Sequence, residues 1–288
     1  MSLGKFDGVH CGHASVLQRV KECSAQLGVP AIAVSFSVQP IAVFKPQFAP
    51  VPLCTFARKA ELIGELGIET LVQIETDEKL LQLSAEEFFR LFFVEKMGVH
   101  TLIEGHNFLF GRDREGTPTL LRELCEWHGI TLEIVPPIFA DGLEISSSRL
   151  RTLIQEGEIE VANALLTRPY RLTGQVVHGD HRGRTLGFPT ANLGEVQTIL
   201  PKPGVYACTC QVGEKTYPVA TNIGFNPTFG QEVHKIESHL IAFEGNLYDK
   251  QLHVDFHQRI RDVVPFESKE ALVEQMKRDV QKIKQLIN

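Results

Sequence analysis

The first half of the chain alternates short apolar runs with segments whose apolar residues recur at helical spacing. Residues 31–36 (AIAVSF) form one apolar run, and residues 56–67 (FARKAELIGELG) have helical spacing before a glycine typical of a helix end. Ser84 and Glu87 give a capping-box pattern at the start of the apolar segment 84–98. The same alternation predicts strands at 68–74, 99–105 and 130–136 and a helix at 117–129. Repeated strand–helix units predict an α/β domain with a parallel sheet.

The second half has a different pattern, in which short alternating segments are separated by glycine and proline turns. The predicted strands are 171–179, 204–213, 215–224, 235–243 and 250–260. Many short strands of this kind predict an all-β domain, a small antiparallel barrel or sandwich. An amphipathic segment at 268–287 predicts a closing helix. The pattern changes near 155–168, which predicts one domain at 1–157 and a second at 168–288.

The composition is that of an ordinary globular protein. Of 288 residues, 43% are hydrophobic and 22% are charged, which excludes a wholly disordered, collagen-like or coiled-coil chain. The net charge of −6 argues against bulk attraction to nucleic acid or to an anionic membrane. The sequence has no run of 18 apolar residues and no signal-peptide pattern. We therefore expect a cytoplasmic protein that acts on small molecules, without a nucleic-acid or membrane partner; a weak homo-oligomer is compatible with the sequence.

None of the six cysteines belongs to a C-x-x-C pair, which argues against a zinc ribbon or a thioredoxin-like site. They are Cys11, Cys23, Cys54, Cys125, Cys208 and Cys210. Cys208 and Cys210 alternate on a predicted strand, so both should point to the same face. Without a secretory segment, the cysteines are predicted to be reduced, buried thiols.

The N-terminal segment GKFDGVHCGH (4–13) has the sharpest local signal for a phosphate site. Gly8 and Gly12 bracket a turn, and His10 and His13 share a face if a helix begins there. A helix N-terminus presents N–H groups and a partial positive charge, so two imidazoles at that end would complete a site for a polyphosphate. An H-x-x-H spacing alone is common and is more often structural. Zinc is disfavoured because no third ligand lies nearby in the sequence.

A second candidate site is the glycine-rich segment HGDHRGRTLGFPTANL. Gly179, Gly183 and Gly187 would let the backbone approach a phosphate chain closely. Thr190 and Asn192 are two apart, so their oxygens can face one side of an extended strand and bind a Mg²⁺ that ATP carries. From composition alone, a glycine-rich hairpin with an Asx turn is the favoured explanation of the segment. The sequence has no G-x-x-x-x-G-K-[ST] motif, which excludes a Walker-type kinase.

Three ordered motifs of the first half resemble one family. GKFDGVHCGH resembles the H-x-G-H nucleotidylyltransferases, and specifically the adenylyltransferase half of the prokaryotic bifunctional riboflavin kinase/FAD synthetases. EGHNFLFGRDREG (104–116) is similar to that family's flavin and nucleotide loop, and ISSSRLR (145–151) to its second phosphate motif, S-S-T-x-x-R. The resemblance implies a Rossmann-like nucleotidylyltransferase domain that transfers the adenylyl group of ATP to FMN.

The resemblance also implies roles for individual residues. His10 and His13 would stabilise the charge that develops on the phosphates, while Asn107 and Phe108 would position flavin or adenine. The ATP phosphates would be held by Ser146, Ser147, Ser148 and Arg151. A serine-rich turn before a helix is otherwise an ordinary N-cap.

Two positions depart from the family pattern. The family has a full hydrophobic strand before the G-x-F-D-G turn, whereas only residues 1–3 precede Gly4 here. The family also has F-x-P-H-P after its next strand, and the corresponding residues 36–40 (FSVQP) contain no histidine. These departures favour an alternative in which the N-terminal half is a degenerate nucleotide- or flavin-binding module. A further alternative is nucleotide transfer to an acceptor other than FMN.

The second half resembles riboflavin kinase through GRTLGFPTANL, followed in order by PGVYA, TNIGFNPTF, IESHLIAF and LYDKQLHVDFHQRIR. The resemblance implies a riboflavin kinase-like barrel in which Glu237 is the general base for the riboflavin 5′-hydroxyl. Thr190 and Asn192 would ligate Mg²⁺ with ATP, and Asn222 would make either a nucleotide contact or a structural one. An isolated glutamate on a strand is otherwise a half-exposed surface residue. The leading prediction is a bifunctional enzyme that uses ATP and Mg²⁺ to convert riboflavin to FMN and FMN to FAD.

Overall fold

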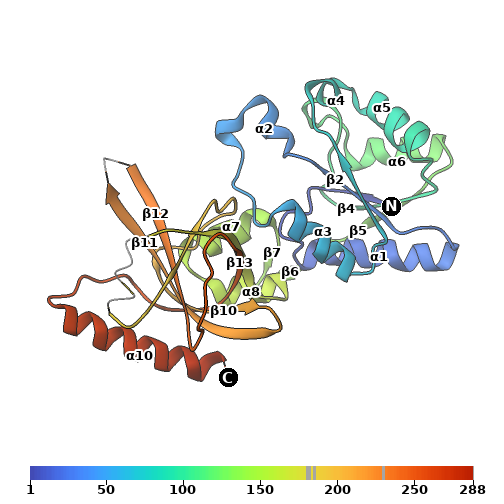
Figure 1. Cartoon of the computed structure of the whole chain (residues 1–288). Helices are drawn as coiled ribbons and strands as arrows, with labels where there is room; N and C mark the ends of the chain where they lie inside the picture. Colours follow the sequence, from blue (N-terminus) through green and yellow to red (C-terminus); the bar gives the residue numbers. More distant parts are fainter. Residues whose placement is uncertain (180–182, 184–185, 229–230, 288) are drawn as a thin grey trace. The chain divides into compact units, whose positions relative to one another are not determined.

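The computed structural model describes residues 1–179, 183, 186–228 and 231–287. The chain forms two compact units, shown together in Figure 1. The first unit consists of residues 1–50 and 55–147, and the second of residues 51–54 and 148–288. Each unit has its own hydrophobic core.

The first unit is built on a parallel sheet, as the sequence predicts. Strand β1 (Ser2–Leu3) pairs with β2 (Ile32–Phe36), β2 pairs with β3 (Thr70–Ile74), and β4 (Thr101–Gly105) pairs with β5 (Thr131–Val135). The Met1 nitrogen donates to the Thr101 carbonyl at 2.7 Å, and the Ile103 nitrogen donates to the Met1 carbonyl at 2.9 Å. These two bonds have the parallel pattern, so β1 lies between β2 and β4.

The helices of this unit cover both faces of the sheet. They are α1 (Cys11–Leu27), α2 (Pro40–Phe44), η1 (Pro46–Phe48), α3 (Phe56–Glu65), α4 (Glu78–Gln82), α5 (Ala85–Phe88), η2 (Phe89–Lys96), η3 (Arg112–Arg114) and α6 (Pro118–Trp127). A short hairpin of β6 (Phe139–Ala140) and β7 (Leu143–Glu144) follows β5. The helices predicted at 56–67, 84–98 and 117–129 are confirmed, whereas the short helices α2 and α4 were not predicted.

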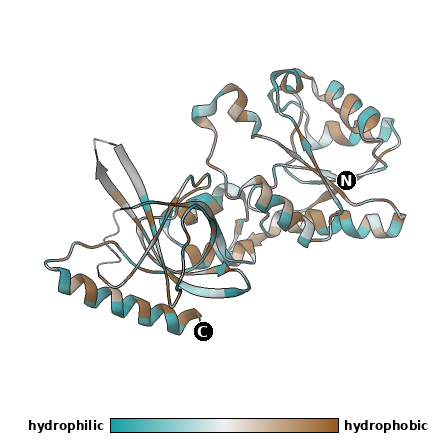
Figure 2. Ribbon diagram, in the orientation of Figure 1, coloured by the Kyte–Doolittle hydropathy of each residue, from teal (hydrophilic) through white to brown (hydrophobic). Residues whose placement is uncertain are grey.

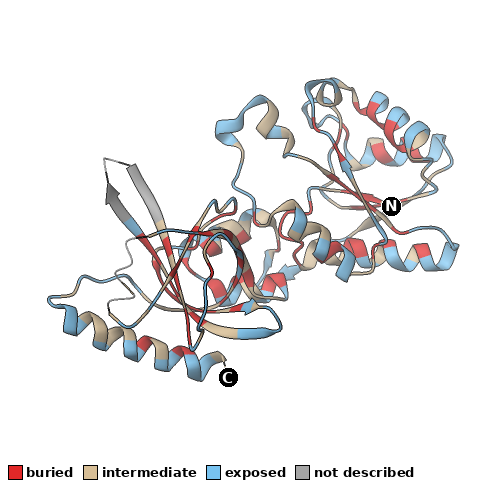
Figure 3. Ribbon diagram, in the orientation of Figure 1, coloured by how far each residue is buried: buried red, intermediate tan, exposed pale blue. Residues whose placement is uncertain are grey.

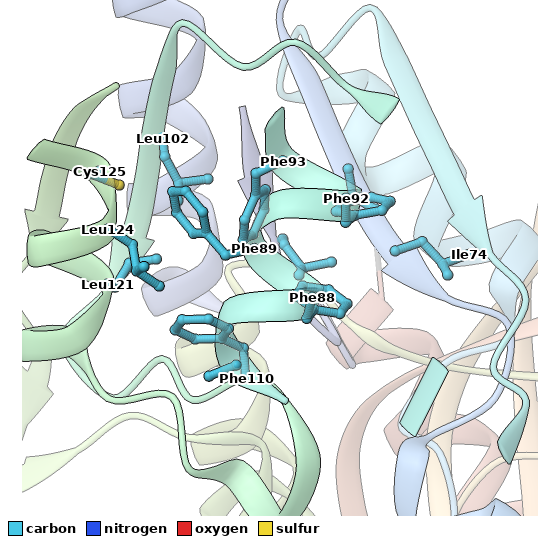
Figure 4. Packing of buried hydrophobic residues seen from close by; sticks show 13 residues of the cluster. Ile74, Phe88, Phe89, Phe92, Phe93, Leu102, Phe110, Leu121, Leu124 and Cys125 are labelled. Carbon is cyan, nitrogen blue, oxygen red and sulfur yellow. The ribbon is translucent and has the colours of Figure 1, made fainter. Parts of the chain in front are cut away.

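The predicted helix at 84–98 has an α-helical start and a π-helical remainder. Ser84 and Glu87 form the predicted capping box, and the wider turns begin at Phe89. Figure 4 shows Phe88, Phe89, Phe92 and Phe93 directed into one cluster with Phe110 and with side chains of α6. Stacked and edge-on phenylalanine rings 5.4–5.7 Å apart fill this side of the sheet. Side chains of α1, α3 and the alternate strand positions fill the other side.

The second unit is a closed six-stranded antiparallel barrel, which confirms the predicted all-β architecture. Its strands are β8 (Tyr170–Val177), β9 (Ala191–Gly194), β10 (Gly204–Val212), β11 (Lys215–Thr228), β12 (Gln231–Leu240) and β13 (Gln251–Arg261). Around the barrel the order is β10-β11-β12-β9-β8-β13. Figure 3 shows the buried positions along these strands. Closure gives each strand two neighbours, although β12 pairs with β9 only at Glu237 and Ser238.

Helices also accompany the barrel in the described part of the second unit. Helix α7 (Ser147–Glu156) begins at the last residue of the first unit and continues into the second, and α8 (Ile159–Leu166) leads into β8. Helix α10 (Lys269–Ile287) confirms the predicted closing helix. Apolar and polar residues alternate along α10 in Figure 2, and Ile283 is fully buried in a cluster with Ala207 and Ile241.

The cysteines follow the sequence prediction in part. Cys125, Cys208 and Cys210 are buried thiols, and the last two point to the same interior face of the barrel as predicted. Burial raises the pKa of the Cys125 and Cys210 thiols to about 11, which keeps them unreactive. Cys11, Cys23 and Cys54 are reduced as well but are half-buried, so the expectation of burial is wrong for these three. Among the described residues, no helix has the length and apolarity that a membrane crossing requires.

Candidate active sites

In the first unit, the predicted phosphate segment forms a tight turn between β1 and α1. The Gly4 nitrogen donates to the Val34 carbonyl at 2.9 Å, and the chain then turns through left-handed backbone at Phe6 (φ 44°), Gly8 (φ 81°) and Val9 (φ 40°). Non-glycine residues rarely adopt this conformation, so the surrounding structure must hold the turn in place. It delivers the chain to the start of α1 at the carboxyl edge of the sheet, where ligands of such sheets bind.

The structure brings His10 and His13 together at the start of α1. Their rings stack with centroids 3.7 Å apart, and the Phe6 ring meets His13 edge-on at 5.5 Å. His10 is the N-cap residue, and in the described part of the chain its side chain makes no capping hydrogen bond. A Cβ on Gly12 would lie 3.1 Å from the His10 ring, so only glycine at this position leaves the ring undisturbed. Sequence spacing found this pair because residues i and i+3 share a helix face.

Asn107 and Phe108 follow β4, the strand next to β1. The carboxyl ends of neighbouring parallel strands share one edge, so both residues lie on the edge that carries the histidine turn. Asn107 is exposed. Phe108 is half-buried and its ring stacks on Phe110, 5.5 Å away, so it is also part of the phenylalanine cluster.

The serine motif lies at the start of α7, at the boundary of the two units. The Ser147 hydroxyl donates to the Asp7 carbonyl at 2.9 Å and so anchors the histidine turn. Ser146 also belongs to the first unit, whereas Ser148 and Arg151 belong to the second. There Arg151 Nε donates to the Val51 carbonyl at 2.9 Å. The sequence predicted phosphate contacts for this motif and did not predict the anchoring role of Ser147.

In the barrel, three predicted site residues form a row across adjacent strands. Asn222 of β11 is the register partner of Glu237 of β12, and Glu237 is the register partner of Asn192 of β9. Directly opposite residues of antiparallel strands point to the same face. All three are half-buried, while their neighbours Thr221 and Ser238 are fully buried, so the row faces away from the barrel interior.

Glu237 has a cationic neighbour on its own strand. Lys235 Nζ lies 3.1 Å from Glu237 Oε1, and the two side chains are each about three-quarters buried. Lys235 was not predicted as a site residue. It lies two positions before Glu237 on the same strand, and its side chain is therefore on the same face as Glu237. The charged ammonium of Lys235 therefore lies in contact with the carboxylate of Glu237.

The glycine-rich segment approaches the row at Asn192. A Cβ on Gly179 would lie 2.3 Å from Asn192 Nδ2, and one on Gly183 would lie 2.4 Å from the Phe188 carbonyl and 3.3 Å from Thr190 Oγ1. Gly187 adopts left-handed backbone (φ 83°). Arg182, Arg184 and Thr185 of this motif lie outside the described residues.

His239 of β12 attaches its strand to the glycine-rich segment. This residue was not predicted from the sequence. Its Nδ1–H donates to the Pro189 carbonyl at 2.8 Å, next to Thr190. Burial lowers the pKa of the His239 imidazole, which favours the neutral ring. The Phe188 ring meets His239 edge-on at 5.4 Å. Asn192 Oδ1 is fully buried and, among the described residues, has no hydrogen-bond partner. An acceptor in this state is suited to a cation.

Comparisons with known proteins cover both units. A family model described as FAD synthetase matches residues 1–149, and one described as riboflavin kinase matches residues 166–287. A bifunctional riboflavin kinase/FMN adenylyltransferase from Pseudomonas fluorescens is 38% identical over 280 residues, which is 97% of this chain and 90% of the relative. A protein of the same description from Bacillus subtilis is 35% identical and covers 98% of this chain, which spans 90% of it.

A solved structure has the same fold over nearly the whole chain. It is described as a macrolide-efflux protein from Streptococcus pneumoniae and superposes with a TM-score of 0.88 at 28% identity. The likeness covers 98% of this chain and 93% of that one. The two family matches and the full-length relatives therefore agree with the division of motifs along the sequence.

Proposed function

Because the chain belongs to the family of bifunctional riboflavin kinase/FMN adenylyltransferases, we propose that its two candidate sites divide two reactions of flavin nucleotide synthesis between them. The chain phosphorylates riboflavin to FMN with ATP and adenylylates FMN to FAD with release of pyrophosphate. The comparisons support this activity over the alternative of a kinase with a degenerate N-terminal module. We propose functional domains at 1–157 and 168–288, a cytoplasmic location, and no nucleic-acid or membrane partner.

The proposed kinase site rests on one observation, the row of Asn222, Glu237 and Asn192 on adjacent strands. In this proposal the Glu237 carboxylate accepts the proton of the riboflavin 5′-hydroxyl as that oxygen attacks the γ-phosphorus of ATP, and ADP leaves. Lys235 Nζ lies 3.1 Å from this carboxylate. Asn222 contacts the nucleotide, and Gly179, Gly183 and Gly187 let the backbone approach the phosphates.

A divalent cation suits the same row. Thr190 and Asn192 offer neutral oxygens, and the buried Asn192 Oδ1 is an acceptor without a described hydrogen-bond partner. Mg²⁺ prefers oxygen ligands and takes few of them from a protein when it is bound to ATP phosphates. Thr190 and Asn192 would hold this ion, which would neutralise charge on the phosphates.

The stacked histidines are the centre of the proposed adenylyltransferase site. An FMN phosphate oxygen attacks the α-phosphorus of ATP, pyrophosphate leaves, and no covalent intermediate with the protein is needed. His10 and His13 stabilise the negative charge that develops at the start of α1. Asn107 and Phe108 position flavin or adenine at the same edge, and Ser146, Ser147, Ser148 and Arg151 are proposed to bind the ATP phosphates.

Product analysis with one variant for each site tests the whole assignment. Glu237→Gln should lower FMN formation from riboflavin by ~10²–10⁴-fold and leave FAD formation from supplied FMN unchanged. The double variant His10→Asn/His13→Asn should show the reverse pattern. Flavins are separated by chromatography after incubation with ATP and Mg²⁺, and each variant's unaffected activity is the control for folding. A Glu237→Gln enzyme that retains most kinase activity would remove Glu237 as the base.

A further inference from the structure

We propose that Lys59 is a positioning residue for adenylyl transfer, and that it acts through the buried Ser35 hydroxyl on the turn that carries the histidine pair. The inference rests on the proposed function of the N-terminal unit. Lys59 lies on α3 and Ser35 near the carboxyl end of β2, in segments that carry none of the motifs discussed above.

A continuous chain of hydrogen bonds joins Lys59 to the turn. Lys59 Nζ donates to Ser35 Oγ at 3.0 Å, and the Ser35 hydroxyl donates to the Lys5 carbonyl at 3.2 Å. Ser35 is 0% exposed, so its hydroxyl is shielded from bulk water. The Phe56 ring, one helical turn before Lys59, lies 5.5 Å from the ammonium and helps to direct it toward the sheet.

The turn needs such a support because its backbone is strained. The carbonyls on either side of Phe6, those of Lys5 and Asp7, are held by two serine hydroxyls that come from distant parts of the chain. Ser35 holds the Lys5 carbonyl and Ser147 holds the Asp7 carbonyl. Phe6 therefore keeps its φ of 44° between two fixed points, as a left-handed non-glycine residue requires.

The Lys59 ammonium is the feature that distinguishes the Ser35 anchor from the Ser147 anchor. A serine hydroxyl has one proton, and here that proton is used on the Lys5 carbonyl. The Lys59 ammonium satisfies the oxygen that remains, and hydrogen bonds to a charged donor strengthen the next bond in the chain. Removal of the ammonium leaves a buried hydroxyl without its donor, which loosens the turn that places His10 and His13.

Lys59→Met, Lys59→Arg, Ser35→Ala and the double variant Ser35→Ala/Lys59→Met test this proposal in the full-length enzyme. We expect Lys59→Met to lower kcat for FAD formation between about 10-fold and about 10²-fold, with a smaller change in KM for ATP. FMN formation from riboflavin should not change. Lys59→Arg should restore most of the activity because it keeps a charged donor. The exposed Lys79→Met on α4 is the matched control.

The double variant separates positioning through Ser35 from an independent role of the lysine. Both residues act on the Lys5 carbonyl. The double variant should therefore lose as much FAD-forming activity as the more damaged single variant. The imidazole NMR resonances of His10 and His13 should shift in Lys59→Met and not in Lys79→Met. Additive losses, unshifted imidazole resonances or an equal fall in FMN formation would each overturn the proposal. Absence of FAD formation by the wild-type chain would instead refute the proposed function. The two failures can be told apart, because the imidazole resonances report on the turn even when there is no catalysis.

Discussion

Gly179 shows how a single missing side chain shapes the kinase site. Its backbone lies so close to the Asn192 amide that a Cβ would be 2.3–2.8 Å from the three terminal atoms of that side chain. The glycine is needed for this close approach, because real Cβ atoms essentially never come within 3.0 Å of another heavy atom. Substitution therefore has to displace Asn192, a proposed Mg²⁺ ligand.

We predict that Gly179→Ala lowers FMN formation by about 10²-fold, because small displacements of a positioning group have effects of that size. FAD formation from supplied FMN should be unchanged. Gly224→Ala is the matched control in the same barrel, since its Cβ would make an ordinary contact 3.6 Å from Asn222 Nδ2. Steady-state kinetics of both variants measure the difference. Equal activity of the two variants would show that Asn192 can move without consequence.

Some residues of the two candidate sites can be predicted from the sequence, and others cannot. Helix spacing predicts the histidine pair, and strand spacing predicts that Thr190 and Asn192 share a face. Asn222 and Glu237 were predicted only from the family resemblance. Lys59 cannot be found in this way, because its contact with Ser35 spans 24 residues and depends on how α3 is rotated against β2. Contacts set by packing between elements have no local signature.

At the scale of elements, periodicity predicts the long helices and the strands, and tertiary contacts decide their details. The segment 84–98 is helical as predicted, but its π-helical part is set by the need to direct Phe89, Phe92 and Phe93 into one cluster. β1 has only two residues, yet it lies between β2 and β4 because its backbone groups and those of Met1 are used on both sides. Neither feature has a pattern in the sequence that could be read locally.

Helix α10 is attached to the barrel by a buried ion pair. Arg261 of β13 donates to Asp279 of α10 at 2.8–2.9 Å, and Gln275 donates to the same carboxylate at 2.9 Å. The Asp279 side chain is 7% exposed. Removal of the arginine leaves a buried charge whose main partner is gone, which costs more than removal of both charges.

We predict that Arg261→Met destabilises the barrel by about 3–5 kcal/mol, and that Arg261→Met/Asp279→Leu is more stable than Arg261→Met alone. Urea unfolding followed through the loss of kinase activity reports on the barrel in particular. Arg278→Met, which removes an exposed arginine paired with Glu274 on the same helix, is the control and should have little effect. A double variant less stable than Arg261→Met would contradict this account of the pair.

At the scale of the whole molecule, pH acts on two opposing sets of carboxylates. Arginine or capping hydrogen bonds lower the pKa of Glu22, Glu87 and Asp262, so these groups stabilise the fold above their ordinary pKa and lose that effect as pH falls. Glu104 is the opposite case. It is a buried residue of β4 that accepts from the Leu3 nitrogen of β1 at 2.8 Å, and its burial raises its pKa well above 4.5.

A carboxyl with a raised pKa holds its proton longer in the folded state than in the unfolded chain. Its stabilising contribution is therefore complete below pH 4.5 and is lost as pH rises through the folded pKa. Glu104→Gln keeps an oxygen to accept from Leu3 and cannot ionise. We predict that the free energy of unfolding of this variant, relative to the parent, increases from pH 4.5 upward by at most about 1.4 kcal/mol per pH unit.

Denaturant unfolding between pH 4.5 and 8, followed through hydrogen exchange of the sheet amides in β1, β2 and β4, measures this difference in the N-terminal unit. Glu126→Gln removes an exposed carboxylate of α6 and controls for the change in net charge. A Glu104→Gln difference that stays flat with pH would mean that Glu104 ionises alike in both states. The result also bears on the proposed adenylyltransferase site, because Glu104 accepts from Leu3 of β1, the strand that leads into the histidine turn. A sheet that weakens as pH rises should lose FAD formation before FMN formation, since the barrel contains no part of this strand.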